Sequence, residues 1–543
     1  MEKAQSRRQF LKTTGLTIGG LATVGMLAQT PAPAYADEND EAETVDDIEW
    51  DEEYDVIVVG GGLAGMASAL TVVSEGDGAT CLLLEKGSAT LGSGNSKYSA
   101  GRVLWTDEVD DFTEYLKELR GDMDNTPDDV LEAFAEGISE NLTWLRSLNN
   151  FVEDDITVGE FYDEDAHESC YPEYPEMEHA HSFGNLYFNS DNDDGITHVL
   201  QLIYTELQDY PDQLTHLLSA PMTALVQDPD DKTILGVTYE YEENTIYAKA
   251  NSGVIMCCGG FEDNATMRGD YLSGTTARPI AAQTNEGDGI TACLKCGADM
   301  WHMNSCAGFW TSVSPIDEGN PAMRTSKKYG ITVAINGQRF FMDHDSDHEH
   351  YWDTWGDITE EDLCTHVGVR HGHMQFGGEW PHLPMPKDTW FIVDSDNYAS
   401  VVEDLGYDPM ELEGYGYEAD TITELAEAIG LPEGELETTV ERWNECCENG
   451  EDIYFHRPEE VLTPVETAPF YGLHCSATLL NTDGGPRRSA QGEILDLDGE
   501  PIPHLYSAGE FGSVWCHMYN GGGNLGECLA FGRISARNCL GIA

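Results

Sequence analysis

The sequence predicts an α/β fold. One α/β domain, built from segments at both ends of the chain, is interrupted by an inserted α+β segment. Residues 54–59 form an apolar run rich in β-branched residues, which is typical of a buried parallel strand. A helix-like stretch (66–74) and a second strand (80–84) follow, as in a βαβ unit. A further strand leads into a glycine turn at 254–261, and glycine turns return near the C-terminus. The 543 residues allow two or three domains with a large core.

The composition is strongly acidic, with 27 Lys and Arg against 100 Asp and Glu, and a formal net charge of −73. A nucleic-acid partner is excluded because the phosphate backbone would be repelled. The same charge argues against docking on an anionic membrane. Partners are therefore expected to be neutral or cationic.

Residues 1–36 have the three parts of a twin-arginine signal peptide in order. Arg7 and Arg8 come first, a weakly apolar stretch follows, and residues 34–36 (Ala-Tyr-Ala) form a small-x-small cleavage site. Residues 37–53 are an acidic linker. We therefore expect export by the twin-arginine route to a periplasmic, extracytoplasmic or cell-surface location. This route commonly carries folded proteins that have already taken up a cofactor.

The turn after the first strand, residues 60–65 (Gly-Gly-Gly-Leu-Ala-Gly), has the spacing of a dinucleotide-binding loop. Gly60 permits a tight turn, Gly62 lets the backbone approach a pyrophosphate, and Gly65 lets helix and strand pack closely. Glu85 ends the second strand 20 residues after Gly65, where a carboxylate binds ribose hydroxyls and would repel a 2′-phosphate. The sequence therefore predicts a Rossmann-like dinucleotide-binding domain.

The fourteen cysteines are dispersed through a large chain, so a disulfide scaffold is not expected. No Cys-x-x-Cys-His occurs, which excludes c-type haem attachment. Six histidines between residues 344 and 373 alternate with acids, and a hard or borderline metal is one interpretation of them. Their spacing matches no familiar metal site, so we predict no metal and interpret the segment as a solvated polar surface.

Several later segments, in order, resemble the fumarate reductase flavoprotein superfamily, and the resemblance covers residues 54–543. They are the Gly/Asn/Ser turn at 91–96, Gly-Gly-Phe at 259–261, 284–290, the Gly-x-Arg-Phe turn at 337–340, 481–485, Ala-Gly-Glu at 508–510 and Gly-Gly-Asn-Leu at 522–525. The resemblance implies non-covalent FAD and a Rossmann-like FAD-binding domain with an inserted α+β substrate or cap domain. The implied boundaries are 54–306 and 461–543 for the FAD-binding domain and 307–460 for the cap.

The glycine loop and the resemblance together predict which residues bind FAD. These are Gly60, Gly62, Ala64, Gly65, Glu85, Lys86, Asn95, Ser96, Gly259, Gly260, Asp288, Glu510, Asn524 and Leu525. The helix that carries Leu525 is expected to direct its N-terminal amides at the flavin.

The active-site segments depart from fumarate reductases. Their His-Pro-Thr before the cap is absent here, and so is the Arg that precedes their Gly-Gly-Asn. The segment from Tyr519 to Gly522 instead resembles the tyrosine segment of FAD-dependent 3-ketosteroid dehydrogenases. Tyr519 and His517 are therefore the predicted catalytic residues, each as a proton donor to the substrate. An arginine in this role stays open, with Arg102, Arg278 and Arg370 as candidates.

The expected function is that of an exported FAD-dependent oxidoreductase that reduces, or forms, an activated C=C bond by hydride transfer at flavin N5. The favoured small-molecule substrate is an α,β-unsaturated ketone or a phenolic. A reductase of fumarate- or urocanate-type unsaturated carboxylates, an oxidase, and a non-enzymatic exported flavin electron carrier are the alternatives. A separate electron-donor protein, a cytochrome or flavoprotein, is expected, with membrane association through that partner only.

Overall fold

The computed structural model divides into two units, Met1–Ile48 and Glu49–Ala543, and every element below lies in the second. The structure describes residues 48–99, 101–122, 125–153, 156–159, 177–180, 182–188, 198–272, 277–280, 282–314, 329–340, 389–457, 459–516 and 519–543. The signal-peptide and linker predictions for residues 1–47 lie outside the described residues, as does the histidine-rich segment at 344–373.

The main sheet has eight strands. Five of them lie side by side and parallel, in the order β19-β9-β1-β2-β6. Strand β18 is antiparallel to β19, while β8 pairs antiparallel with β9 and β7 with β8. The predicted strands at 54–59, 80–84 and 254 onward are confirmed as β1, β2 and the end of β9. The bounds are β1 (Glu52–Val59), β2 (Cys81–Leu84), β6 (Leu214–Leu217), β7 (Met222–Gln227), β8 (Ile234–Tyr241), β9 (Asn244–Met256), β18 (Glu493–Leu495) and β19 (Pro501–Ser507).

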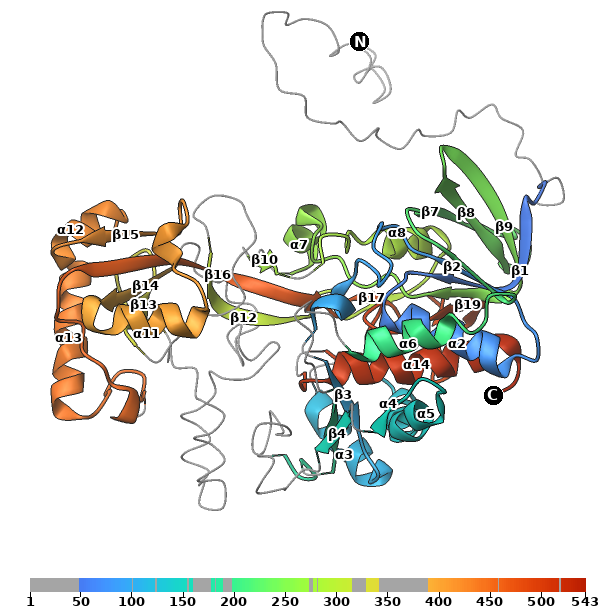
Figure 1. The fold of residues 1–543 in the computed structure, drawn as a ribbon, viewed down its shortest axis with the longest axis horizontal. Helices are drawn as coiled ribbons and strands as arrows, with labels where there is room; N and C mark the ends of the chain where they lie inside the picture. Colours follow the sequence, from blue (N-terminus) through green and yellow to red (C-terminus); the bar gives the residue numbers. More distant parts are fainter. Residues whose placement is uncertain are drawn as a thin grey trace, which may run out of the picture. The chain divides into compact units, whose positions relative to one another are not determined.

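The parallel part of this sheet is buried on both faces, as its continuous apolar runs predict. In β1, Val56 and Val58 pack into one core cluster, whereas Ile57 and Val59 pack into another on the opposite face. Helices α2, α6 and α14 lie together on the first face (Figure 1). Helices on this side are α2 (Leu63–Glu75), α3 (Val109–Arg120), α4 (Asp128–Ser139), α5 (Asn141–Ser147), α6 (His198–Leu207) and α14 (Gly523–Leu540).

The second core is closed by the antiparallel strands β7 and β8 and by helix α8 (Asp288–Lys295). Smaller elements complete the region. They are η2 (Asn95–Tyr98), β3 (Arg102–Trp105), β4 (Ile156–Gly159), β5 (Gly184–Phe188), α7 (Ala265–Tyr271), β11 (Met300–Trp301) and β17 (Gly485–Pro486), with the pairings β3-β5-β4 and β11-β17.

A separate six-stranded sheet forms around the long strand β16 (Phe470–Thr482), and its pairs are antiparallel except for β10 with β16. Consecutive residues of β14 face opposite sides of this sheet, so Trp390 packs into one hydrophobic cluster and Phe391 into another. The other strands are β10 (Arg278–Pro279), β12 (Cys306–Val313), β13 (Ile331–Val333), β14 (Thr389–Asp394) and β15 (Gly416–Ala419). The accompanying helices are α11 (Ser395–Leu405), η6 (Pro409–Glu411), α12 (Ile422–Ala428), α13 (Glu435–Asn449) and η7 (Glu459–Val461).

The structure has an α/β part and a second sheet with its own helices, in agreement with the fold predicted from the sequence. Strand β16 lies after residue 460, yet it pairs with β12, β14 and β15 from the segment assigned to the cap. The domain boundaries themselves stay predictions. In the described part of the chain, no helix is both long and apolar enough to cross a lipid bilayer.

Candidate functional site

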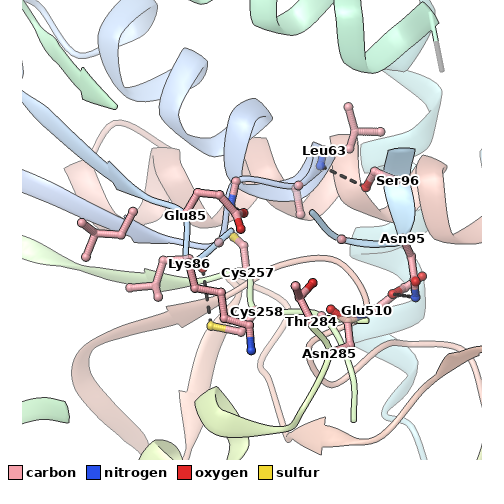
Figure 2. Close-up of a pocket in the computed structure, with 18 of the residues that line it drawn as sticks. Leu63, Glu85, Lys86, Asn95, Ser96, Cys257, Cys258, Thr284, Asn285 and Glu510 are labelled. Carbon is pink, nitrogen blue, oxygen red and sulfur yellow. Dashed lines mark hydrogen bonds between the residues drawn. The ribbon is translucent and has the colours of Figure 1, made fainter. Parts of the chain in front are cut away.

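One pocket is lined by the residues that directly follow four parallel strands. Gly60 follows β1, Glu85 follows β2, Cys257 follows β9 and Ala508 follows β19, and all four line the same pocket. Figure 2 labels Glu85 and Cys257 among them. Carboxyl ends of parallel strands are where open α/β sheets bind ligands.

The glycine loop between β1 and α2 is built for a close backbone approach. Gly60 has a φ of +109°, and a Cβ there would lie 2.2 Å from the carbonyl oxygen of Cys257. A Cβ on Gly65 would lie 1.8 Å from the carbonyl oxygen of Gly60. Gly62 starts helix α2 without a capping side chain. The first turn of α2 therefore presents backbone N–H groups and the positive end of the helix dipole to the pocket, an arrangement suited to a phosphate.

Glu85 is buried and its carboxylate holds the loop. Its Oε2 accepts a hydrogen bond from the Gly61 N–H at 2.9 Å, and its Oε1 accepts one from the Gly87 N–H at 2.6 Å. The next residue, Lys86, forms ion pairs with Glu286 at 3.1 Å and Asp288 at 3.2 Å. Asp288 is the first residue of α8, so this ion pair joins β2 to α8 at the rim of the pocket.

The turn at Asn95 and Ser96 closes another side of the pocket. The Ser96 hydroxyl accepts a hydrogen bond from the Leu63 N–H at 3.0 Å, at the start of α2 (Figure 2). Asn95 donates from Nδ2 to Glu262 at 2.7 Å and to Glu510 at 3.0 Å. The short helix η2 is thus fixed to both the glycine loop and the C-terminal part of the chain.

Ten of the fourteen predicted cofactor residues line this pocket: Gly60, Gly62, Ala64, Glu85, Lys86, Asn95, Ser96, Gly259, Asp288 and Glu510. The other four, Gly65, Gly260, Asn524 and Leu525, are not part of its lining. Gly65 packs against the loop, and a Cβ on Gly260 would lie 2.0 Å from the Thr482 hydroxyl. Asn524 and Leu525 are buried in the first turn of α14, where Asn524 donates to Glu510 at 3.2 Å.

Tyr519 is buried and does not belong to the pocket lining. Its ring packs edge-on against Trp515, and its hydroxyl accepts a hydrogen bond from the Asn524 N–H at 3.4 Å. Since Asn524 in turn contacts Glu510, the phenol is one residue away from the pocket wall. His517 lies outside the described residues, so its predicted role stays a prediction.

Sequence reasoning missed several residues of the site. Glu262 directly follows the Gly-Gly-Phe turn and is fully buried. Its position next to this motif could have identified it as a residue of the site. Cys528 enters the wall from the second turn of α14. Ala220 and Met222, at the start of β7, carry no local motif. Within the described residues, no group of three or more His, Cys, Asp or Glu side chains could hold a metal ion.

The residues present fit FAD. The loop at Gly60 and the uncapped start of α2 suit the pyrophosphate, and buried Glu85 stands where a ribose hydroxyl would be held. The buried Oδ1 of Asn524 has no hydrogen-bond partner among the described residues, so this side chain retains an acceptor at the end of α14.

Comparison with known proteins decides the family. The model of the family described as "FAD binding domain" matches residues 55–525. The chain belongs to this family. The chain is accordingly a flavoprotein, and the pocket at the strand ends is its candidate FAD site.

The chain is similar to two curated proteins and to one solved structure. It is 31% identical to 3-oxosteroid 1-dehydrogenase of Mycobacterium tuberculosis over 320 residues, 53% of this chain and 52% of that protein. It is 26% identical to digoxin reductase of Eggerthella lenta over 100% of this chain and 98% of that one. The structure of 3-ketosteroid Δ1-dehydrogenase from Sterolibacterium denitrificans, with 1,4-androstadiene-3,17-dione, has a TM-score of 0.70 at 19% identity, covering 90% and 100% of the two chains.

The chain spans about half the length of the first curated relatives that it matches. The structural similarity, at 19% identity, shows the fold alone. It agrees with the predicted α/β architecture.

Three cysteines line the FAD site, and their thiols are expected to be inert. Burial raises the pKa of Cys257 to about 12 and raises the pKa of Cys258 and Cys528 well above the ordinary value. A raised thiol pKa leaves the neutral thiol in place up to high pH, and only the thiolate reacts. At pH 8 we expect iodoacetamide to alkylate Cys257 about 1,000-fold more slowly than a free cysteine of pKa ~8.5, and Cys258 and Cys528 also to react slowly.

Site-resolved mass spectrometry of the holoprotein over time checks this expectation. The same protein in urea is the control, since every cysteine should then react at the free rate. Rapid modification of Cys258 in the folded protein would contradict the burial argument.

Proposed function

We propose that this chain is an exported FAD-dependent oxidoreductase that acts on a CH–CH group, reducing or forming an activated C=C bond of a small organic substrate. The favoured substrate is a neutral α,β-unsaturated ketone or phenolic. The observation that carries the proposal is the FAD site at the strand ends in a chain that aligns end to end with digoxin reductase. The 3-oxosteroid 1-dehydrogenase similarity supports a carbonyl-activated substrate.

When bound, FAD supplies hydride transfer at N5, and the chain's own residues supply binding and proton transfer. Tyr519 is the proposed proton donor. Its hydroxyl contacts the N-terminus of α14 through the Asn524 N–H, and the positive end of the helix dipole stabilises a phenolate there. His517, two residues earlier, is the alternative donor. The neighbouring Trp515 and the surrounding core keep water away from the phenol.

A carboxylate substrate is a second candidate because of the position of Arg102. This residue lies on β3 with its guanidinium over the Tyr187 ring at 5.4 Å. A Cβ built on Gly522, the residue before α14, would lie 3.4 Å from the Arg102 Cβ. An arginine at that position suits recognition of a carboxylate.

The electron donor is proposed to be a separate protein, a cytochrome or flavoprotein outside the cytoplasm. The net charge of −73 favours a partner with a cationic docking surface. Membrane association would then occur through this partner only.

The test is anaerobic reoxidation of the reduced holoprotein by a panel of enones, cinnamates, urocanate and fumarate, followed by flavin absorbance. We expect rapid reoxidation by a neutral enone. Reoxidation by fumarate or urocanate only, lost in Arg102→Gln, would replace this proposal with the carboxylate one. Reoxidation by oxygen alone would indicate an oxidase. If no compound of the panel reoxidises the flavin, the proposed substrate classes are wrong.

Tyr519→Phe tests the proposed proton donor. With FAD still bound, we expect kcat with the enone to fall by about 100-fold or more, as for removal of a general acid. Tyr115→Phe is the matched control, because Tyr115 is also buried and donates to Asn520 at 3.1 Å, next to Tyr519. Equal kcat in both variants would exclude Tyr519 and leave His517 or an arginine as the donor.

A further inference from the structure

Two carboxylates, the buried Glu262 and the partly buried Glu510, lie on either side of one amide nitrogen at the FAD site. Asn95 Nδ2 donates to Glu262 Oε1 at 2.7 Å and to Glu510 Oε2 at 3.0 Å. Glu262 has no exposed surface, and Glu510 is part of the pocket wall. The pair therefore sits between the protein core and the cofactor.

The described residues give both carboxylates hydrogen bonds from neutral donors only. Besides Asn95, Glu262 accepts from Asn285 Nδ2 at 2.6 Å and from the Thr482 hydroxyl at 3.1 Å. Glu510 accepts from Asn524 Nδ2 at 3.2 Å. Glu262 thus has three donors and Glu510 has two, so the negative charge is better accommodated on Glu262.

The charged and titratable groups that face the pair are mostly acidic. Asp483 and Glu527 act on Glu510 through their charges, and the thiols of Cys528 and Cys306 lie in the same region. The cations nearby are Arg488, which pairs with Glu527 at 3.2 Å, and Arg268, whose guanidinium donates to the Glu262 backbone carbonyl.

Two ionised carboxylates this close together in a buried site repel each other strongly. Burial, followed by the charge of Glu262, raises the pKa of Glu510 well above its ordinary value, and burial also raises the pKa of Glu262. Both shifts favour the neutral acid, more strongly for Glu510, and the titration belongs to the pair rather than to one residue.

We propose that Glu262 and Glu510 share one proton while the bound FAD is oxidised and take up a second proton from solvent when it is reduced. Two-electron reduction of FAD with one proton leaves one additional negative charge in the pocket. That charge acts on Glu510 in its wall through a medium of low dielectric constant and favours protonation of the remaining carboxylate. In total, two electrons from the reductant and two protons from solvent enter the protein, and no bond to substrate is formed.

The test is the pH dependence of the FAD midpoint potential in the holoprotein, measured against reference dyes between pH 7 and 8.5. The slope gives the number of protons taken up with two electrons. We expect two in the wild-type protein and one in Glu262→Gln, because the variant removes the carboxylate that binds the second proton. An unchanged slope in Glu262→Gln would overturn the proposal.

Glu206→Gln is the matched control. Glu206 is 2% exposed on α6, and its carboxylate accepts hydrogen bonds from the backbone and side chains of Asn149 and Asn150. It shares no hydrogen-bond partner with the pair, so its variant should keep the slope of two protons. A slope of one in this control would mean that any buried charge change has the same effect, which would also overturn the proposal.

One further measurement keeps the proposal testable if Glu262→Gln loses FAD. In the wild-type holoprotein, the infrared difference spectrum on reduction should gain a carboxylic-acid C=O band, and its absence would count against the proposal. The proposal depends on bound FAD and not on the proposed substrate, so a failed substrate panel leaves it unaffected.

Discussion

Replacing Gly65 by alanine is expected to abolish stable FAD binding, with an affinity lower by about 100-fold or more. The new Cβ would lie 1.8 Å from the carbonyl oxygen of Gly60 and 3.4 Å from Val58 Cγ1. Because the closest atom belongs to the backbone, α2 must shift away from β1. Overpacking of this kind typically costs about 1–3 kcal/mol or more. That shift moves the start of α2, where the pyrophosphate is expected to bind.

The flavin content of purified Gly65→Ala protein, and FAD titration of the stripped protein, measure this effect. Gly269→Ala is the control, because Gly269 lies in α7 and a Cβ there would have no neighbour within 4 Å. The control should retain FAD. Full flavin content in Gly65→Ala would show that the tight contact between helix and loop is not required.

Replacing Arg488 by methionine is expected to lower the free energy of unfolding by about 3–5 kcal/mol, the usual effect of breaking a buried ion pair. The guanidinium is fully buried and donates to the carbonyl oxygens of Gly509 at 2.7 Å, Phe511 at 3.2 Å and Gly512 at 2.5 Å. It also pairs with buried Glu527 at 3.2 Å. The variant leaves these acceptors unpaired, so chemical denaturation should reveal a large loss of stability.

The adjacent residue offers a matched control. Arg487 pairs with Asp299 at 2.7 Å, and both side chains are partly exposed, so Arg487→Met should cost no more than about 1 kcal/mol. Adding Glu527→Gln to Arg488→Met should recover part of the lost stability, because the uncompensated carboxylate is then removed. If Arg487→Met and Arg488→Met lower the free energy of unfolding equally, burial of the Arg488–Glu527 pair adds nothing to stability.

Arg488 also affects the FAD site, because its three carbonyl partners surround Glu510 in the sequence. We therefore expect weaker FAD binding in Arg488→Met, in addition to the loss of stability. No local motif marks this arginine. Its role depends on the turn after β17 meeting the turn after β19.

The local features of the FAD site could be predicted from the sequence alone. The glycine spacing from Gly60 to Gly65, the flanking strands and Glu85 lie within about one βαβ unit, and each has a steric or electrostatic requirement that few residue types meet. The strand β1, the helix α2 and the strand β2 were therefore predicted close to their observed bounds. The later motifs added Asn95, Asp288 and Glu510 through resemblance.

The assembly of distant segments was decided by the tertiary structure. Which side chains meet depends on the strand order β19-β9-β1-β2-β6 and on register, and neither is encoded in a local spacing. This order brings Cys257, Glu510 and Cys528 into one pocket and places Glu262 under Asn95. It also places Tyr519 next to the start of α14 and outside the lining of this pocket. The sequence by itself thus determined the cofactor class, while the packing of strands far apart in the chain determined which carboxylates share its pocket.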